Sequence, residues 1–445
     1  MRIVLKNFRL IDEETDSSGT VVIDDGIITE VHSQALAQKH CQTYEKDAAM
    51  IIDAKAMPGG SQLLLTPAFV DLHAHLREPG YFEKETLESG SMAAAAGGFG
   101  TVICMANTNP IIDSLEKANV LKQRSDVLGL IDLYPVISLT HNLEGKILSG
   151  ITDISSQTEC AIDQGRKRYL PLMLSEDGKD IADDDLFLDA MKEAKRIGIP
   201  VSCHCDFGGI EDQAVQRVIE LGKNAGCHIH IAHVSTKESV DAIRQAKTQG
   251  FSLSCEVMPH NLCLTVHTAA KLGKETFGKV NPSLQEHEDT EALKAGLVDG
   301  TIDAIATDHA PHTMEDKEKG APGFSAFETA FSSCFTELVL GKDVENGSHL
   351  KASTILDIRQ LSSFMSARPA RLIGLGNKAG SSGIAGRGRL LPGYRADLTI
   401  IDTESYFNVE PQHFKSKGKN SPFTGLKLYG KVLMTLHRGR IVYEA

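Results

Sequence analysis

The chain has 445 residues, of which 41% are apolar and 24% charged, and its formal net charge is −13. This length suffices for one large core plus a smaller domain, while the acidic balance, with no run of Lys or Arg, argues against a nucleic-acid-binding surface. Nine cysteines without framework spacing favour reduced thiols, and because neither a signal-peptide h-region nor an apolar run of about 20 residues occurs, we expect a cytoplasmic protein that binds no membrane.

The N-terminal segment, residues 1–65, is rich in β-type patterns, and Asp24-Asp25-Gly26 predicts a hairpin turn. From Thr66 to about Leu375, short apolar, β-branched runs alternate with helical stretches, which is typical of βα units. Strands are predicted to end near His75, Asn107, Thr140, Ser175, His204, His233, Pro259 and Asp308, with helices over 85–96, 115–127, 184–197, 214–225, 236–248 and 288–298. Eight βα units predict a TIM (β/α)8 barrel over 66–380, and no Gly-rich dinucleotide fingerprint follows a strand to favour a doubly wound open sheet.

The C-terminal segment, 381–445, is again β-rich, with a strand expected over 398–401 and a hairpin turn at Arg438-Gly439. The Gly- and Ser-rich stretch 380–386 is expected to be a connector. We therefore predict an α/β fold in which both chain ends meet in a small β-sandwich domain beside the barrel.

The motif Asp71-Leu72-His73-Ala74-His75 follows the apolar run 63–70, which predicts a buried strand. Alternate side chains of a strand share a face, so His73 and His75 project the same way at the carboxyl end. A His-x-His pair is by itself more often structural than metal-binding. Barrel enzymes, however, carry their chemistry at this rim, and the same rim is predicted to receive Asp177, His204, His233 and Asp308.

Four histidines and two aspartates at one rim would be a costly accumulation of charge without a cation between them. The rim therefore predicts a metal site. Two further histidines, His228 and His230, stand earlier in their strand and are expected to pack or to hydrogen-bond inside the barrel.

The stretch from His73 to Gly80, His-Ala-His-Leu-Arg-Glu-Pro-Gly, resembles the strand-one motif of the type I bacterial dihydroorotases in the amidohydrolase superfamily. Met105-Ala106-Asn107-Thr108 resembles their Met-Pro-Asn-Thr motif, and the resemblance covers essentially the whole chain. It implies one or two Zn²⁺ ions per subunit, with His73, His75 and Asp308 on one, His204 and His233 on the other, and Asp177 between them. Asp308 is also implied to be the catalytic base and then acid.

Most of the superfamily bridges two metals with a carboxylated lysine at the position of Asp177. The upstream Lys167 stands seven residues before Leu174, roughly 23 Å away in an extended chain, so it is too far to serve. Glu176 stands next to Asp177 and is left open as a competing ligand.

The resemblance implies reversible conversion of N-carbamoyl-L-aspartate to L-dihydroorotate in pyrimidine (UMP) biosynthesis. Arg77 can hold the substrate carboxylate through a guanidinium fork, and Asn107 and His312 can add donors. The family pattern adds Asn281 and, in a mobile loop over 313–324, backbone groups of Ala321 and Gly323. Three departures from the family motifs, Ala106, Asn261 and Gln285, affect substrate contacts more than the reaction class.

Two other functions stay open. A hydantoinase or allantoinase is disfavoured by Arg77, because their substrates carry no carboxylate beside the ring nitrogen. A catalytically inactive homologue that serves aspartate transcarbamoylase is disfavoured because every predicted ligand is present. For the active enzyme we expect a homo-oligomer, with aspartate transcarbamoylase as a partner protein.

Overall fold

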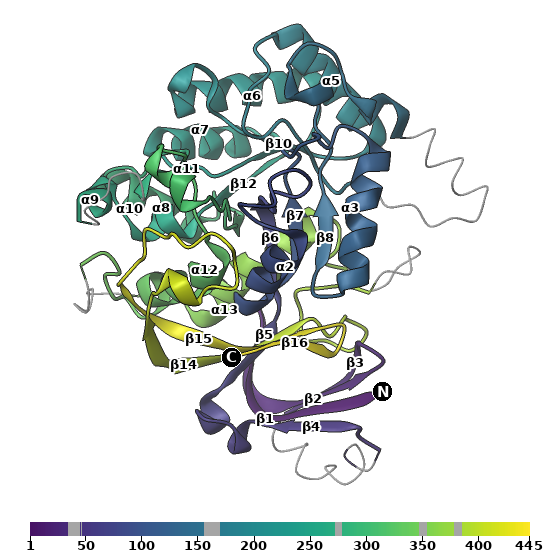
Figure 1. Ribbon diagram of the computed structural model, residues 1–445, viewed down its shortest axis with the longest axis vertical. Coiled ribbons are helices and arrows are strands. Elements are labelled where there is room, and N and C mark those ends of the chain that lie inside the picture. Colours follow the sequence, from purple (N-terminus) through teal and green to yellow (C-terminus); the bar gives the residue numbers. More distant parts are fainter. Residues whose placement is uncertain (34–44, 46, 155–169, 272–277, 347–353, 378–384) are drawn as a thin grey trace.

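The computed structural model describes the chain except residues 34–44, 46, 155–169, 272–277, 347–353 and 378–384 (Figure 1). Its centre is a closed barrel of parallel strands. They are β6 (Phe69–Ala74), β7 (Phe99–Cys104), β8 (Asp132–Pro135), β9 (Leu174–Ser175), β10 (Val201–Cys203), β11 (Ile229–Ile231), β12 (Leu253–Val257) and β13 (Ala304–Ile305). Sheets β6–β8 and β9–β13 are joined by two parallel bridges, Ile137 with Leu174 and Ala74 with His309. The predicted TIM barrel is confirmed.

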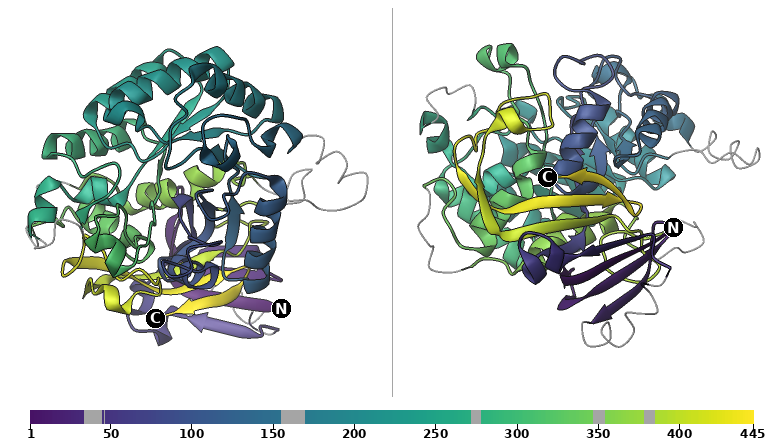
Figure 2. Two further views of the ribbon diagram at one scale, coloured as in Figure 1. Left: turned by 45° about the horizontal axis from the view of Figure 1, so that its top comes forward. Right: turned by 60° about the horizontal axis from the view of Figure 1, so that its bottom comes forward.

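Every residue of the barrel strands is buried except Tyr134 in β8, which is half-buried, as expected of parallel strands covered on both faces. Helices lie in an arc outside them (Figure 2). They are α2 (Leu87–Ala96), α3 (Leu115–Leu128), α5 (Asp184–Ile197), α6 (Glu211–Ala225), α7 (Lys237–Thr248) and α10 (His287–Asp299), with α8 (Pro259–Cys263), α9 (Val266–Lys271), α11 (Met314–Glu318), α12 (Phe327–Cys334), α13 (Ile358–Ser362) and α14 (Arg368–Leu372) in the later part of the chain.

Local signals set the helix ends. The predicted helix 184–197 matches α5, whose N-cap Asp183 accepts from the main-chain N–H groups of Asp185 and Leu186 and whose C-cap Gly198 has φ 73°. The predicted helix 85–96 begins two residues late because Thr86 and Ser89 form a capping box. None of the helices in the described part of the chain combines the length and apolar character needed to cross a membrane.

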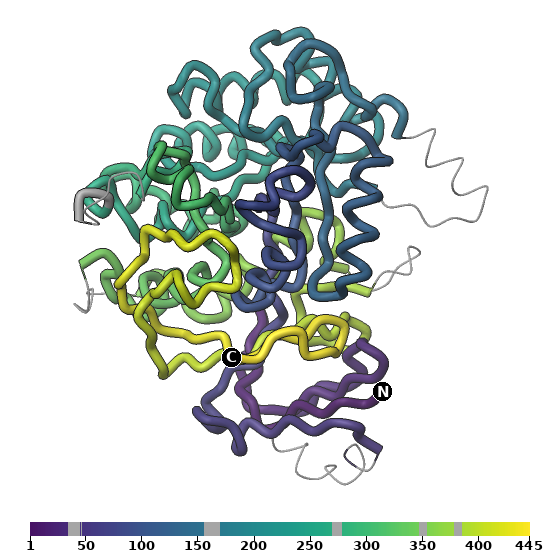
Figure 3. Tube along the Cα trace, viewed as in Figure 1, coloured from purple at the N-terminus to yellow at the C-terminus, as the bar shows by residue number. Residues whose placement is uncertain are grey.

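Both chain ends build the small β-domain, as predicted. Its sheet runs β16-β15-β14-β5-β1-β2-β3. The strand β4 pairs with the first half of β1, on the same edge that β5 pairs with further along. The strands are β1 (Arg2–Ile11), β2 (Asp16–Asp24), β3 (Ile27–Ser33), β4 (Met50–Asp53), β5 (Leu64–Pro67), β14 (Leu398–Asn408), β15 (Lys427–His437) and β16 (Arg440–Glu444). Apolar side chains from the purple N-terminal and yellow C-terminal strands, which lie side by side (Figure 3), form one buried cluster.

The two predicted hairpin turns have the positive φ angles of type I′ turns, 49° and 81° at Asp25-Gly26 and 50° and 71° at Arg438-Gly439. The interpretation of 63–70 as a single strand is wrong. Residues 64–67 pair with β14 and β1 in the small domain, whereas Phe69 begins the barrel strand β6. Pro67 lacks an N–H group and so interrupts any shared ladder. Most of the predicted connector 380–386 lies outside the described residues.

Candidate metal centre and active site

The side chains predicted as metal ligands gather at the carboxyl ends of the barrel strands. They are His73 in β6 and His75 directly after it, Asp177 after β9, His204 after β10, His233 after β11 and Asp308 after β13. Together they line a cavity of about 220 Å³. Nε2 of His73 lies 3.2 Å from Oδ1 of Asp177, and Nε2 of His75 lies 3.1 Å from Oδ1 of Asp308. His204 Nδ1 and His233 Nε2 share a hydrogen bond of 2.8 Å.

The donor set fits a metal cation. Two overlapping groups, His73–His75–Asp308 and His73–Asp177–His233, each bring their ligand atoms within 4.8 Å of one another. Both ring nitrogens of His73 are buried and, although carboxylates lie nearby, neither has a partner in hydrogen-bonding geometry among the described residues. An unsatisfied buried nitrogen is costly, and coordination would satisfy it. Imidazole and carboxylate ligands suit zinc, and also manganese or cobalt.

The electrostatics of the centre call for positive charge. Burial opposes protonation of His73, yet the charge and contact of Asp177 outweigh it and raise the pKa of His73 well above its usual value. Burial likewise opposes ionisation of Asp308, but the hydrogen bond and charge of His75 lower the pKa of Asp308 to about 2. A proton therefore balances the carboxylates here, and a metal cation can take that place.

The backbone is strained around the same cavity. Arg77, His233 and Asp308 have φ angles of 60°, 36° and 45°, a region that costs a non-glycine residue on the order of 1–3 kcal/mol. Strain of this kind concentrates at functional sites, where the surroundings hold the side chain in a required direction.

Asn107, predicted to contact substrate, lines the cavity and also links two candidate ligands. Its Oδ1 lies 2.9 Å from Nδ1 of His75, and its Nδ2 donates to Oδ2 of Asp177 at 3.0 Å. With Nδ1–H donating to Asn107, Nε2 of His75 keeps its lone pair for a metal. By contrast Glu176 turns away, since it accepts from the main-chain N–H of Thr140 at 2.9 Å and from the Thr140 hydroxyl.

One buried residue that the sequence analysis missed is Glu256 in β12. Its carboxylate lies 3.2 Å from Nδ1 of His73 and 3.1 Å from Nε2 of His230, and all three side chains are almost fully buried. His230 also hydrogen-bonds Ser254 at 2.8 Å, in agreement with its expected place inside the barrel. The sequence signal that could have identified Glu256 is a single carboxylate within the otherwise uncharged strand Leu253–Val257.

Arg77 is half-buried and has no ion-pair partner among the described residues. Its Nε donates to the carbonyl of Pro311 at 3.1 Å, and its Nη2 lies 3.2 Å from Nε2 of His312. Burial, and then the charge of Arg77, lower the pKa of His312 to about 3, so this ring is neutral. The adjacent carboxylate, Glu78, does not pair with Arg77, because it pairs with Arg124 and accepts from the main-chain N–H of Leu87.

The other residues predicted to contact substrate differ in whether they line the cavity. Asn281 and Gly323 line the cavity, but Ala321 does not. The main-chain N–H groups of Ala321 and Gly323 donate to the carbonyls of Asp316 and Lys279, so both N–H groups are already hydrogen-bonded within the protein.

The departures from the family motifs lie around this site. Ala106 and Asn261 are buried, and the side-chain amide of Asn261 has no hydrogen-bond partner among the described residues. Gln285 donates to Ser235 and Ser283. None of the three is among the residues that line the cavity.

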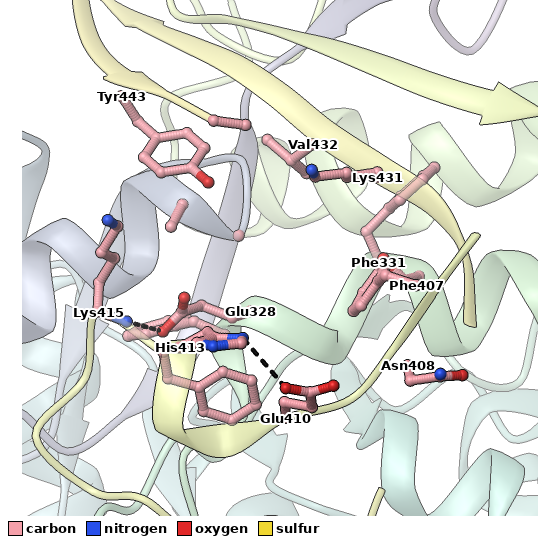
Figure 4. A pocket seen from close by; sticks show the side chains of 16 residues that line it. Glu328, Phe331, Phe407, Asn408, Glu410, His413, Lys415, Lys431, Val432 and Tyr443 are labelled. Carbon is pink, nitrogen blue, oxygen red and sulfur yellow. Dashed lines mark hydrogen bonds and ion pairs between the residues drawn. The ribbon is translucent and has the colours of Figure 1, made fainter. Parts of the chain in front are cut away.

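A second cavity, of about 290 Å³, lies between α12, β15 and the C-terminus (Figure 4). Aromatic side chains line it, among them Phe331 and Tyr443, together with Glu328. Neither of the two candidate metal-binding groups in the described residues includes a residue of this cavity. The cavity that contains the histidines is therefore the candidate active site.

Comparison with known proteins covers the whole chain. The Amidohydrolase family model matches residues 64–442. The dihydroorotase of Clostridium botulinum (strain Eklund 17B / Type B) is 36% identical over 453 residues, and that of Citrifermentans bemidjiense is 36% identical over 475 residues, each alignment covering 100% of both chains. Among solved structures, the L-hydantoinase (dihydropyrimidinase) of Arthrobacter aurescens superposes with a TM-score of 0.79 at 25% identity, covering 99% of this chain and 96% of its own.

Proposed function

Because the chain belongs to the amidohydrolase family, we propose that it is a dihydroorotase that interconverts N-carbamoyl-L-aspartate and L-dihydroorotate in pyrimidine biosynthesis. Arg77 carries this proposal, since its half-buried side chain lines the same cavity as the candidate metal ligands and has no carboxylate partner among the described residues. Dihydroorotate has a carboxylate next to its ring nitrogen, whereas hydantoin and allantoin do not. A guanidinium fork binds such a group through two charge-assisted hydrogen bonds.

We propose that the centre holds one or two zinc ions. His73, His75 and Asp308 would bind one ion and His204 and His233 the other, with Asp177 between them. Bound zinc would polarise the scissile carbonyl and lower the pKa of water to about 7. The ligand geometry around His73 and the unsatisfied nitrogens of its ring support this assignment.

Asp308 is the proposed proton carrier. Its carboxylate is ionised at neutral pH because its pKa lies near 2, and its Oδ1 lies within the same small cavity as Arg77 and the histidines. In the ring-opening direction an Asp308 oxygen would accept a proton from the attacking water and return it to the departing amide nitrogen, so acid and base roles alternate on one group.

Substrate binding is proposed to involve several groups around Arg77. The Pro311 carbonyl and the His312 ring hold the guanidinium in place. Asn107, Asn281, Gly323 and Ala321 stay proposed contacts, Asn107 through rearrangement of its present hydrogen bonds. A cytoplasmic homo-oligomer with aspartate transcarbamoylase as partner is likewise proposed on the family resemblance.

The test is hydrolysis of L-dihydroorotate by zinc-loaded protein, with hydantoin and allantoin as control substrates. We expect turnover of dihydroorotate alone. Faster turnover of hydantoin would instead favour a hydantoinase, the activity by which the Arthrobacter enzyme is named. Stoichiometric zinc without any turnover would favour an inactive homologue.

A further inference from the structure

Lys317 is a fully buried lysine next to the candidate active site. Its Nζ donates to the main-chain carbonyls of Lys279 at 3.0 Å, Ala321 at 2.9 Å and Gly323 at 2.8 Å. An ammonium group has three N–H donors, so all of them are used. No carboxylate lies within ion-pair distance of it in the described part of the chain, which leaves the carbonyls as its partners.

The three carbonyls belong to two segments that reach the active-site cavity. Lys279 stands two residues before Asn281, while Ala321 and Gly323 flank Pro322. Asn281, Pro322 and Gly323 all line the cavity. The Gly323 N–H also donates to the Lys279 carbonyl at 3.0 Å, so the two segments meet directly beside the Lys317 ammonium.

Lys317 is held in this position by the start of α11. Thr313 caps the helix, and its hydroxyl and the Asp316 carboxylate form a capping box immediately after His312. At the other end of the loop Gly323 has φ +110°, and a Cβ there would lie 2.7 Å from the Ala310 carbonyl oxygen. The loop therefore packs closely against Ala310 at Gly323, and the Lys317 ammonium hydrogen-bonds the residues just before it.

A buried ammonium is unfavourable unless hydrogen bonds compensate it. Burial, and then the charge of Lys279, lower the pKa of Lys317 to about 8. A methionine of similar length would fill the same space without this cost. The arrangement thus gives up stability while ordering two segments of the cavity wall, which points to a requirement for that order.

We propose that Lys317 is a positioning residue for substrate binding, because its ammonium holds the 279–281 and 321–323 segments together as one wall of the active-site cavity. The expected effect on the KM for dihydroorotate rests on the proposed dihydroorotase function, whereas the expected ordering of the two segments does not. Loss of the ammonium would release three carbonyls and loosen the wall. None of the proposed zinc ligands contacts Lys317 directly, so metal binding and the chemical step would be retained.

The test compares Lys317→Met with Lys319→Met. The control removes the same charge from the same loop, but Lys319 is exposed and pairs with Glu315. In Lys317→Met we expect the KM for dihydroorotate to rise at least about tenfold, because a tenfold change corresponds to the free energy of roughly one charge-assisted hydrogen bond. We expect kcat and the zinc content to stay near the wild-type values. Lys319→Met should match the wild type in all three.

Hydrogen–deuterium exchange without substrate supplies an independent readout. The amides of Ala321 and Gly323 should exchange at least about tenfold faster in Lys317→Met, whereas amides of the barrel strands should not. Lys317→Gln keeps two N–H donors and should give exchange rates and a KM between those of the wild type and Lys317→Met. This variant also allows the test if Lys317→Met does not fold. Unchanged exchange or an unchanged KM in the methionine variant would overturn the inference. Absence of dihydroorotate turnover in the wild type would count against the proposed function alone.

Discussion

Glu256→Gln is the sharpest test of how the candidate metal centre is supported. Glu256 lies 3.2 Å from His73 Nδ1 and 3.1 Å from His230 Nε2. Glutamine preserves the volume, but it replaces one carboxylate oxygen by an NH₂ group, which cannot accept from an imidazole N–H. One of the two histidines would therefore face an NH₂ group in place of the carboxylate oxygen that now lies beside it, and the site would lose a buried negative charge.

The expected loss is in metal affinity. A carboxylate that orients a metal-binding histidine typically contributes a factor of about 10–100 to the affinity, which corresponds to about 1.4–2.7 kcal/mol. Both Glu256 and His73 are almost fully buried, so solvent cannot replace the missing partner and the upper part of this range applies. At a fixed zinc concentration above Kd, the thermal stabilisation by zinc should decrease by the same free energy.

Zinc affinity would be measured by competition with a chromophoric chelator, and thermal unfolding with and without zinc. Glu337→Gln is the matched control, because Glu337 is also buried and pairs with Lys294 at 2.9 Å but does not line the cavity. The control should lower the melting temperature equally with and without zinc. If Glu256→Gln bound zinc within twofold of the wild type, the proposed support of His73 would be refuted.

Other predictions address the proposed base, the substrate specificity, the metal and one half-buried carboxyl group. Asp308→Asn should retain zinc by elemental analysis and lose nearly all turnover; an active variant would contradict its role as proton carrier. Arg77→Met should raise the dihydroorotate KM sharply, by the loss of about 3 kcal/mol of charge-assisted binding, while an unchanged KM would point to a different cyclic amide. Dialysis against a chelator should abolish activity, and zinc should restore it. Burial raises the pKa of Glu328 to about 7, so the native state keeps a proton that the unfolded state loses near pH 4.3, and stability falls as the pH rises between these values. Glu328→Gln keeps an acceptor for the Lys415 and Ser416 N–H groups and should be more stable than the wild type at pH 8 but not at pH 4, as urea unfolding at both pH values would show.

The sequence predicted the barrel because its signals are local. Alternating apolar runs and capped helices recur along 66–375, and each candidate ligand stands at or just beyond the end of a strand. The same local reasoning failed at 63–70, where one apolar run supplies two strands. Only pairing with β14 and β1 assigns residues 64–67 to the small domain, and pairing depends on distant parts of the chain.

What the sequence determined by itself is the set of residue types at the barrel rim, including His73 and the guanidinium of Arg77. Contacts between residues far apart in the chain were decided by the tertiary structure. Closure of the barrel through Ala74 and His309 brings Asp308 to His75, and it also brings Glu256 of β12 within 3.2 Å of His73 in β6, although β13 lies between these two strands. Periodicity places a side chain on a face or at a strand end, but its partners follow from how the strands close and how the loops pack, which no local pattern encodes.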